Sequence, residues 1–295
     1  MILVFGGTTE GRKAVEVLEE AWKAYFYSTK TGEQELTLHH GLRIDGAMDA
    51  EAMCAFCRDH DIRLIIDAAH PFAATLHATI QEVAAAQDIP VVRYERIYPP
   101  RDPDITWIDD YTRVPRDLHS LLATTGVQSI SKLKWLEGKG IKVFYRILNR
   151  ESSIALAKAQ GAEDDQLCFY EDANDIPVEA DAILLKESGE SGGFTEKVKA
   201  ARAKGMRVIA IKRPLTMDNR LSIVNGPYGL RRAVEQLLPE FFPLHSGLTT
   251  GTCATAAVVA ATCQLLTGEQ PATVPIRLAD GETIDVAVGY ADGCA

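Results

Sequence analysis

A glycine-rich turn stands at the start of the chain, where a short apolar run gives way to an amphipathic segment. The run begins at Met1 and ends at Phe5, and Gly6, Gly7 and Gly11 follow it. A strand that ends in such a turn and leads into a helix points backbone N–H groups and the positive end of the helix dipole at one place, which suits a phosphate. The spacing matches two of the three glycines of the dinucleotide pattern G-x-G-x-x-G, and a threonine holds the middle position. The residues expected to bind a pyrophosphate are Gly6, Gly7, Thr8, Thr9 and Gly11, although glycines also occur in such turns for steric reasons alone.

The end of the second expected strand, 24–28, bears on the choice of cofactor. Sites specific for NAD usually place a carboxylate there, where it binds the ribose hydroxyl. This chain instead continues with Ser28, Thr29, Lys30 and Thr31, which offer hydroxyls and a cation but no acid. These four residues favour a ribose 2′-phosphate, and hence NADPH over NADH, unless they form an ordinary solvated loop.

Further polar residues follow other expected strands, at positions that share one edge of a parallel sheet. His70 follows strand 64–67 and could bind a ligand or shuttle a proton, or could be structural. The other residues that we expect on the substrate side are Arg93, Arg96, Lys186, Ser188, Gly189 and Arg213. A single Lys or Arg is usually solvated surface charge, but repetition at one topological position favours binding of an anion.

Several common catalytic patterns are absent from the sequence. It has no Tyr followed four residues later by Lys, no phosphate-binding G-x-x-x-x-G-K-[ST], no G-x-S-x-G and no H-E-x-x-H. We therefore expect no metal site and identify no catalytic nucleophile. The two remaining expected sites are one for a dinucleotide and one for a polyanion. Hydride transfer is consistent with these sites, because the cofactor supplies the hydride and the protein needs no nucleophile or metal of its own.

The elements that position these residues alternate between strands and helices. In the first half, strands are expected at 1–5, 24–28, 64–67 and 90–94, with helices at 12–22, 49–60 and 71–87. A second series has strands at 126–130, 141–145, 166–170, 181–185 and 206–211, with helices at 152–160, before 204 and at 228–238. Strands spaced by helices predict parallel sheets with right-handed crossovers. The fold class is therefore α/β, with two Rossmann-like lobes, an interlobe cleft and an incomplete C-terminal segment.

Changes in composition predict the domain boundaries. We expect a nucleotide-binding lobe at 1–103, a second α/β lobe at 104–240, and a linker with an unfinished third domain at 241–295. That last segment contains an alanine-rich helix at 254–266 and a hairpin that turns at Asp280–Gly281.

Composition excludes several classes of protein. The net charge of −10 argues against binding to nucleic acid. Neither a secretory signal nor a run near the length of a membrane span is evident, so we expect a cytoplasmic location and no membrane partner. The six cysteines do not form a disulfide framework, and the pair Cys54 and Cys57 is expected to be two buried thiols. No feature of the sequence indicates an oligomeric state.

The combination of motifs over residues 1–240 resembles the precorrin-6A reductase family. The segments that carry the resemblance are 6–11, 67–73, 93–96, 186–193 and 212–214, with Glu187 in place of the neutral residue expected between Lys and Ser. The resemblance implies an NAD(P)H-dependent oxidoreductase acting on a CH–CH group, which reduces precorrin-6A or its cobalt complex to the 6B form in cobalamin biosynthesis. It also implies a tetrapyrrole substrate with many carboxylates, which would account for the cations.

The C-terminal segment has a resemblance of its own. Residues 245–254 resemble the start of cobalt-precorrin-5B C1-methyltransferases, which implies S-adenosylmethionine as a cofactor only for a complete domain. The run Thr249–Thr252 before a helix also fits plain helix capping. Two other functions remain open from the residues themselves: a non-catalytic dinucleotide-sensing module, and a reductase of a smaller carboxylated substrate.

Overall fold

The computed structural model describes residues 1–30, 32, 34–170, 175–214, 222–279 and 281–290. The chain divides into two compact units, of which the first combines Met1–Glu95 with Met217–Ala295 and the second is Arg96–Thr216. This division differs from the lobes expected at 1–103 and 104–240, because the chain returns to the first unit after the second is complete. The expected Thr31 and Asp280 lie outside the described residues.

The first unit is built on a parallel sheet of six strands in the order β12-β5-β4-β1-β2-β3. Its strands are β1 (Ile2–Phe5), β2 (Tyr25–Thr29), β3 (Gly41–Asp45), β4 (Leu64–Asp67), β5 (Val91–Tyr94) and β12 (Ser222–Val224). Its helices are α1 (Thr9–Glu19), α2 (Ala50–Asp59), α3 (Ala74–Gln87) and α7 (Pro227–Leu237). The order reverses at β1, and in such sheets ligands bind beyond the carboxyl ends of the strands at this point.

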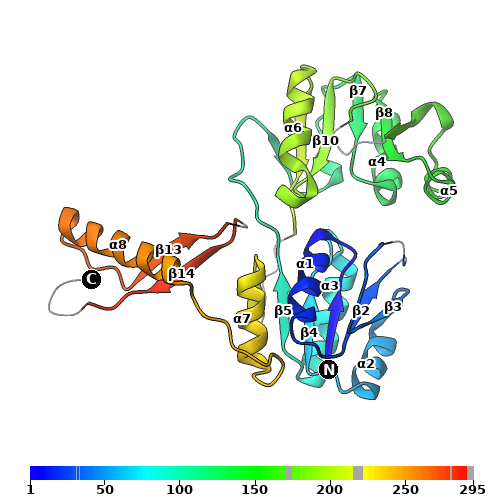
Figure 1. The fold of residues 1–295 in the computed structure, drawn as a ribbon. Coiled ribbons are helices and arrows are strands. Elements are labelled where there is room, and N and C mark those ends of the chain that lie inside the picture. The colour runs from blue at the N-terminus through cyan, green and yellow to red at the C-terminus, as the bar shows by residue number, and fades with distance from the viewer. Residues whose placement is uncertain (31, 33, 171–174, 215–221, 280, 291–295) are drawn as a thin grey trace. The chain divides into compact units, whose positions relative to one another are not determined.

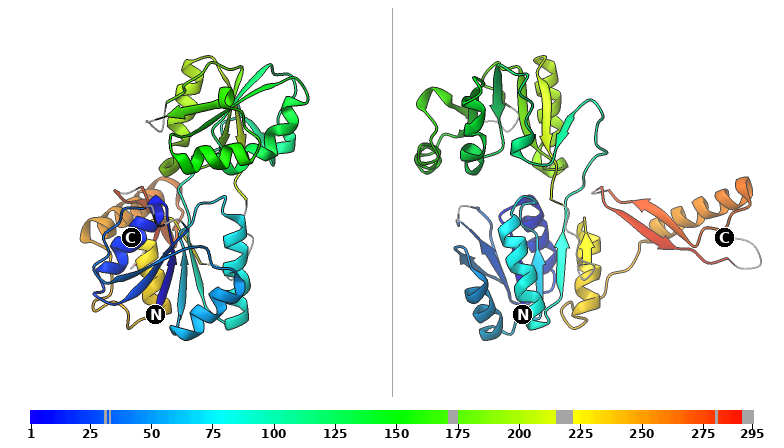
Figure 2. Two further views of the ribbon diagram at one scale, coloured as in Figure 1. Left: turned by 90° about the vertical axis from the view of Figure 1, so that its right-hand side faces the viewer. Right: turned by 180° about the vertical axis from the view of Figure 1, so that it is seen from behind.

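Both faces of this sheet are covered, which explains the fully buried strands. On one face, Ile2 and Val4 of β1 pack with residues of α1 and with Leu230 and Val234 of α7. On the other face, the alternating β1 residues pack with α2 and α3. Figure 2 shows α1 and α7 on one side of the strands and α2 and α3 on the other. We expected the helix at 228–238 to close the second lobe, and that prediction is wrong because α7 completes the core of the first.

The second unit has another parallel sheet of six strands, in the order β6-β11-β10-β7-β8-β9. Its strands are β6 (Thr106–Ile108), β7 (Ser120–Ala123), β8 (Lys142–Leu148), β9 (Leu167–Tyr170), β10 (Ala182–Lys186) and β11 (Arg207–Ile211). Its helices are α4 (Ile130–Glu137), α5 (Glu151–Ala159) and α6 (Phe194–Ala203). The α6 residues Phe194, Val198 and Ala201 pack on the face formed by β10, β11 and β7.

One expected strand of the second unit is a helix start. Residues 127–129 form a 3₁₀ turn that runs into α4, whereas the strand at this place is β7, a few residues earlier. Gly126 has a φ of 86°, in the left-handed region, so the extended chain ends before it. The buried Leu121, Leu122 and Ala123 are the residues that enter the sheet.

The C-terminal segment of the first unit holds α8 (Thr250–Thr267) and an antiparallel hairpin of β13 (Thr273–Arg277) and β14 (Thr283–Ala287). Figure 1 shows α8 beside this hairpin. Ala256 and Ala260 of the helix pack with Val274 and Val286 of the hairpin. By length and composition alone, α8 is long and apolar enough to cross a membrane, with a mean hydropathy of 1.3. The sequence analysis did not predict this. A single helix of this kind is weak evidence for a membrane role.

A buried carboxylate joins this hairpin to α7. The two carboxylate oxygens of Glu282 accept hydrogen bonds from the backbone N–H groups of Tyr228 (3.0 Å) and Gly229 (2.7 Å). A Cβ at Gly226 would overlap the Glu282 carboxylate. The glycine therefore leaves room for an anion at the positive end of the α7 dipole.

Candidate functional site

The opening glycine turn is packed against the ring of Tyr27 in the neighbouring strand. A Cβ at Gly6 would overlap that ring, and a Cβ at Gly11 would lie 2.8 Å from the Tyr27 Oη and 2.9 Å from the Gly6 Cα. The hydroxyl of Tyr27 accepts a hydrogen bond from the Gly7 backbone N–H (3.0 Å) and donates one to Gln34 (2.5 Å). Lack of space for a side chain therefore explains Gly6 and Gly11, which is the steric reason for glycine that the sequence analysis left open.

At Gly7 the backbone conformation, and not a contact with a neighbouring side chain, favours glycine. Its φ is 84°, and an added Cβ would meet no atom within 4 Å. The surface above the turn is therefore open at the first turn of α1. This opening, beside the positive end of the α1 dipole, fits a pyrophosphate.

The hydroxyl of Thr8 is already committed to the fold. It caps α1 by accepting a hydrogen bond from the Gly11 N–H (3.0 Å), and it donates one to the Ala68 carbonyl (2.7 Å). Its single proton is thus used within the protein, so an anion at the turn would meet backbone N–H groups. The same contact ties the turn to the loop after β4, which lies beside β1 in the sheet.

An acid lies near the end of β2, although not on that strand. Asp45, at the end of β3, accepts a hydrogen bond from the Thr29 hydroxyl (2.8 Å) and pairs with Arg43 (3.1 Å). The hydrogen bond from Thr29 and the contact with Arg43 lower the pKa of the Asp45 carboxyl. The sequence reading missed this group because it missed β3. Ser28 and Thr29 are buried and Lys30 is exposed.

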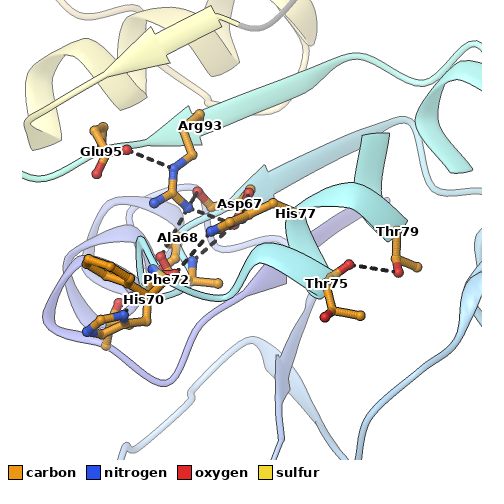
Figure 3. A network of polar contacts seen from close by, with 11 residues as sticks. Asp67, Ala68, His70, Phe72, Thr75, His77, Thr79, Arg93 and Glu95 are labelled. Carbon is orange, nitrogen blue, oxygen red and sulfur yellow. Dashed lines mark hydrogen bonds and ion pairs between the residues drawn. The ribbon is translucent and has the colours of Figure 1, made fainter. Parts of the chain in front are cut away.

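A network of polar contacts occupies the carboxyl end of β4 (Figure 3). The buried carboxylate of Asp67 contacts Nδ1 of His77 (2.6 Å) and the guanidinium of Arg93 (2.9 Å). Burial would raise the pKa of the Asp67 carboxyl, but the hydrogen bond from His77 and the charge of Arg93 outweigh it and lower the pKa. Asp67 is therefore a carboxylate, and its two neighbours hold the loop after β4 in place.

Arg93 and His70 play different parts in this network. The Arg93 guanidinium is buried and also donates to the backbone oxygens of Asp67 (3.1 Å) and Ala69 (3.0 Å). His70 is half-buried, and its Nδ1 accepts a hydrogen bond from the Phe72 N–H (3.2 Å). This hydrogen bond fixes the orientation of the His70 ring. Arg93 supports the loop from within, a role that its sequence position did not indicate.

In the second unit, Glu187 at the carboxyl end of β10 binds two arginines, Arg101 and the predicted Arg213. Arg101 binds its carboxylate at 3.0 and 2.9 Å, and Arg213 binds it through both side chain (2.7 Å) and backbone N–H (2.8 Å). Burial would raise the pKa of the Glu187 carboxyl, but these hydrogen bonds outweigh burial and lower the pKa. The Arg213 guanidinium also lies 3.7 Å from the centre of the Tyr98 ring.

The remaining cations of this edge lie close enough to repel one another. Burial lowers the pKa of Lys186 to about 8, and the charge of Lys132 acts in the same direction. Burial likewise lowers the pKa of Lys197, and so do the charges of Arg146 and Arg96. Like charges gathered at one place raise the affinity of that place for an anion.

The loop after β10 is compact and held by cations. Arg96 donates to the carbonyl oxygen of Ser188 (2.8 Å), and the Lys197 amine donates to that of Gly192 (2.9 Å). Gly189 has a φ of 70°, and its Cβ would lie 2.9 Å from the Ile97 carbonyl oxygen. The structure thus brings Arg96, Lys186, Ser188, Gly189 and Arg213 to one edge of the second unit, whereas His70 and Arg93 belong to the first.

The sequence reading missed Lys197 and Gln34. Lys197 lies within α6, where a lysine is indistinguishable from a solvated one by pattern. Gln34 follows the expected loop and donates a hydrogen bond to the Thr8 carbonyl oxygen (3.1 Å). No local signal marks such a residue, because its partner is distant in the sequence.

Comparisons with known proteins agree with the fold and the motifs. The family model "Precorrin-6x reductase CbiJ/CobK" matches residues 1–228, and the CbiD model matches residues 239–293. A cobalt-precorrin-6A reductase of Synechocystis sp. is 29% identical over 75% of this chain and 91% of the relative. A precorrin-6A reductase of Rhodococcus erythropolis is also 29% identical, over 72% of this chain and 89% of the relative.

A solved structure shares the fold. The chain described as "CobK precorrin-6A reductase" superposes with a TM-score of 0.62 and 17% identity, over 80% of this chain and 96% of that one. The predicted α/β class with two parallel-sheet lobes is confirmed, and so is the predicted fusion of the two families. The chain belongs to the CbiJ/CobK precorrin-6x reductase family over residues 1–228 and continues into a CbiD segment.

Proposed function

We propose that this chain reduces precorrin-6A, or its cobalt complex, to the 6B form with a hydride from a reduced nicotinamide dinucleotide. The family match over residues 1–228 carries the proposal. Both relatives named above are reductases of precorrin-6A or cobalt-precorrin-6A, and each is covered along most of its length. The reaction makes the chain an oxidoreductase acting on a CH–CH group, with a cytoplasmic location as our expectation.

The first unit would hold the dinucleotide. The N–H groups at the start of α1, with Gly7 and Thr9, would bind the pyrophosphate, and Ser28, Thr29 and Lys30 would lie near the adenosine ribose. The open surface above Gly7 supports this assignment. When bound, the cofactor supplies the hydride.

NADPH is our expected donor, for a reason that now includes Asp45. A ribose 2′-hydroxyl favours a free carboxylate, whereas a 2′-phosphate favours cations. The Asp45 carboxylate already pairs with Arg43 and Thr29, and Lys30 is exposed beside them. This balance of charge supports the phosphorylated cofactor.

The second unit would bind carboxylates of the macrocycle. Lys186, Arg96 and Lys197 lie at the edge where its strands end, and Ser188 and Gly189 shape the loop there. Arg213 is a weaker candidate because Glu187 compensates its charge. His70, which belongs to the first unit, remains a proposed substrate-binding residue. The C-terminal segment would need a complete CbiD domain to use S-adenosylmethionine.

Anaerobic incubation of the full chain with cobalt-precorrin-6A and either NADPH or NADH tests the proposal. We expect a change in the absorbance of the macrocycle and a product heavier by one hydride and one proton, with NADPH preferred. Failure with both donors would overturn the reductase assignment, and a clear preference for NADH would overturn the choice of cofactor. The rival sensor module predicts dinucleotide binding without any product.

A further inference from the structure

The hydroxyl of Tyr27 belongs to a chain of hydrogen bonds that begins and ends on the glycine turn. The Gly7 backbone N–H donates to this hydroxyl at 3.0 Å, and the hydroxyl lies 2.5 Å from the side-chain oxygen of Gln34. The side-chain nitrogen of Gln34 lies 3.1 Å from the Thr8 carbonyl oxygen. A backbone N–H can only donate and a carbonyl oxygen can only accept, so the direction of each bond follows. Tyr27 donates to Gln34, and Gln34 donates to Thr8.

Packing keeps the Tyr27 hydroxyl in place. The Tyr27 ring is fully buried in the core of the first unit, and the absence of side chains at Gly6 and Gly11 leaves the space that it occupies. Burial also raises the pKa of the Tyr27 phenol. The hydroxyl therefore keeps its proton near neutral pH, as its bond to Gln34 requires.

The contact with Tyr27 decides which donors of the turn an anion can use. Gly7 holds a φ of 84°, and its N–H is taken by the Tyr27 hydroxyl. The Gly6 N–H donates to the Ser28 carbonyl oxygen (3.0 Å). A pyrophosphate at the turn therefore depends on the N–H groups at the start of α1, because the first donors of a helix have no acceptor within the helix. The turn that Tyr27 holds sets the direction of these groups.

Gln34 connects the turn to the segment that follows β2. Gln34 is half-buried, and its amide bonds to Tyr27 through the oxygen and to Thr8 through the nitrogen. The segment is also held at its start, where the Thr29 hydroxyl accepts a hydrogen bond from the Gly32 N–H (3.2 Å). The ribose and the pyrophosphate of one dinucleotide would thus meet two stretches of chain that a single amide joins.

We propose that Tyr27 and Gln34 are positioning residues for the dinucleotide: the phenol and the amide hold the glycine turn in the shape that receives the pyrophosphate, and they join it to the segment after β2. The inference rests on the proposed function, because it takes the turn to bind the dinucleotide. Both residues act through the backbone of the turn and not on the reacting atoms. The tetrapyrrole site is not part of the inference.

Two variants remove the polar groups and keep most of the side-chain volume. Tyr27→Phe removes the hydroxyl and keeps the buried ring, and Gln34→Leu removes both bonds of the amide. The matched control is Tyr25→Phe. Tyr25 lies on the same strand with an equally buried ring, and its hydroxyl bonds to Glu19 (2.7 Å), at the opposite end of α1 from the turn.

Calorimetric titration of the full chain with NADPH alone measures the effect. For Tyr27→Phe and for Gln34→Leu we expect a Kd about tenfold above the original, which corresponds to about one lost hydrogen bond. Tyr25→Phe should lower the melting temperature as Tyr27→Phe does, but its Kd should stay within about twofold of the original. An unchanged Kd in Tyr27→Phe, or an equal loss of affinity in Tyr25→Phe, overturns the inference.

The double variant Tyr27→Phe/Gln34→Leu tests whether the two residues act as one unit. Its Kd should be close to that of either single variant, because one broken bond already interrupts the chain that both residues form. If the two losses of affinity multiply instead, Tyr27 and Gln34 act separately and the inference fails.

Amide hydrogen exchange at Gly7, followed by NMR, needs neither ligand nor reaction. Exchange should be faster in Tyr27→Phe and unchanged in Tyr25→Phe, and an unchanged rate in Tyr27→Phe would overturn the inference. This proposal and the proposed function can fail separately. If the variants behave as expected but the original chain reduces no tetrapyrrole, the reductase assignment fails and the positioning of the turn stands. If the original chain is an active reductase and Tyr27→Phe keeps its Kd for NADPH, the reverse holds.

Discussion

Replacement of Glu187 by Gln removes the anion that holds two arginines of the second unit together. The Glu187 side chain is 4% exposed, whereas those of Arg101 and Arg213 are 40% and 24% exposed. Breaking a fully buried pair by removing one partner costs about 3–5 kcal/mol. Solvent reaches both arginines here, so we expect Glu187→Gln to lower the free energy of unfolding of this unit by about 2 kcal/mol near neutral pH.

The pH dependence of this difference has a definite sign. The folded pKa of Glu187 is below its ordinary value of 4.5, so its stabilisation is complete above that value. Stabilisation is lost as the pH falls below 4.5 through the folded pKa, and glutamine cannot titrate. The difference in unfolding free energy between the original chain and Glu187→Gln should therefore shrink on acidification.

Urea unfolding followed by tryptophan fluorescence measures this difference. Trp107 and Trp135 both belong to the second unit, whereas Trp22 is 79% exposed and reports little. The control is Glu179→Gln, at an exposed acid of the same unit, which we expect to change nothing. Equal unfolding free energies for Glu187→Gln and the original chain near neutral pH, or a difference that grows on acidification, would refute the reasoning.

Three further predictions concern the turn, the cationic edge and the C-terminal hairpin. Gly6→Ala should lower the melting temperature of the first unit and abolish NADPH binding, because the new Cβ overlaps the Tyr27 ring. Calorimetry measures both effects, and an unchanged affinity for NADPH would contradict the pyrophosphate assignment. Because the pKa of Lys186 is about 8, the KM for the tetrapyrrole should rise as the pH passes above 8. Lys186→Met should have a high KM that no longer responds to pH in this range. If the original chain and the variant show the same dependence of KM on pH, this role for Lys186 is contradicted. Gly226→Ala should displace the Glu282 carboxylate and speed proteolysis of the C-terminal segment, and an unchanged cleavage rate would show that the contact holds nothing.

The sequence predicted the interior strands well because burial on both faces leaves continuous apolar runs. β1 is such a run, and β4 and β5 are apolar apart from Asp67 and Arg93. Each of the three lies close to its expected place. The edge strands β3 and β12 were missed: Leu42 and Ile223 are exposed, and neither strand has a two-faced apolar pattern. Pairing of β12 with β5 also joins segments far apart in the chain, which local periodicity cannot indicate.

The glycine motif shows what a spacing can and cannot predict. Gly6, Gly7 and Gly11 were correctly identified as a turn between a strand and a helix. The reason for two of them is the ring of Tyr27, a residue on the next strand that no local pattern connects to the turn. Of these three glycines, Gly7 alone combines a positive φ with open space, so within the motif the structure adds support for a ligand at Gly7.

Charge compensation decides which predicted cations remain suited to an anion. A Lys or Arg after a strand has the same sequence signature whether it faces a ligand or an acid of its own protein. Glu187 compensates Arg101 and Arg213, and Asp67 compensates Arg93. The charge of Lys132 acts on Lys186, and those of Arg146 and Arg96 act on Lys197, with Glu196 as a weaker opposing charge. Repulsion around Lys197 falls when a carboxylate binds, so the substrate's affinity should depend on Lys197 more than on Arg213.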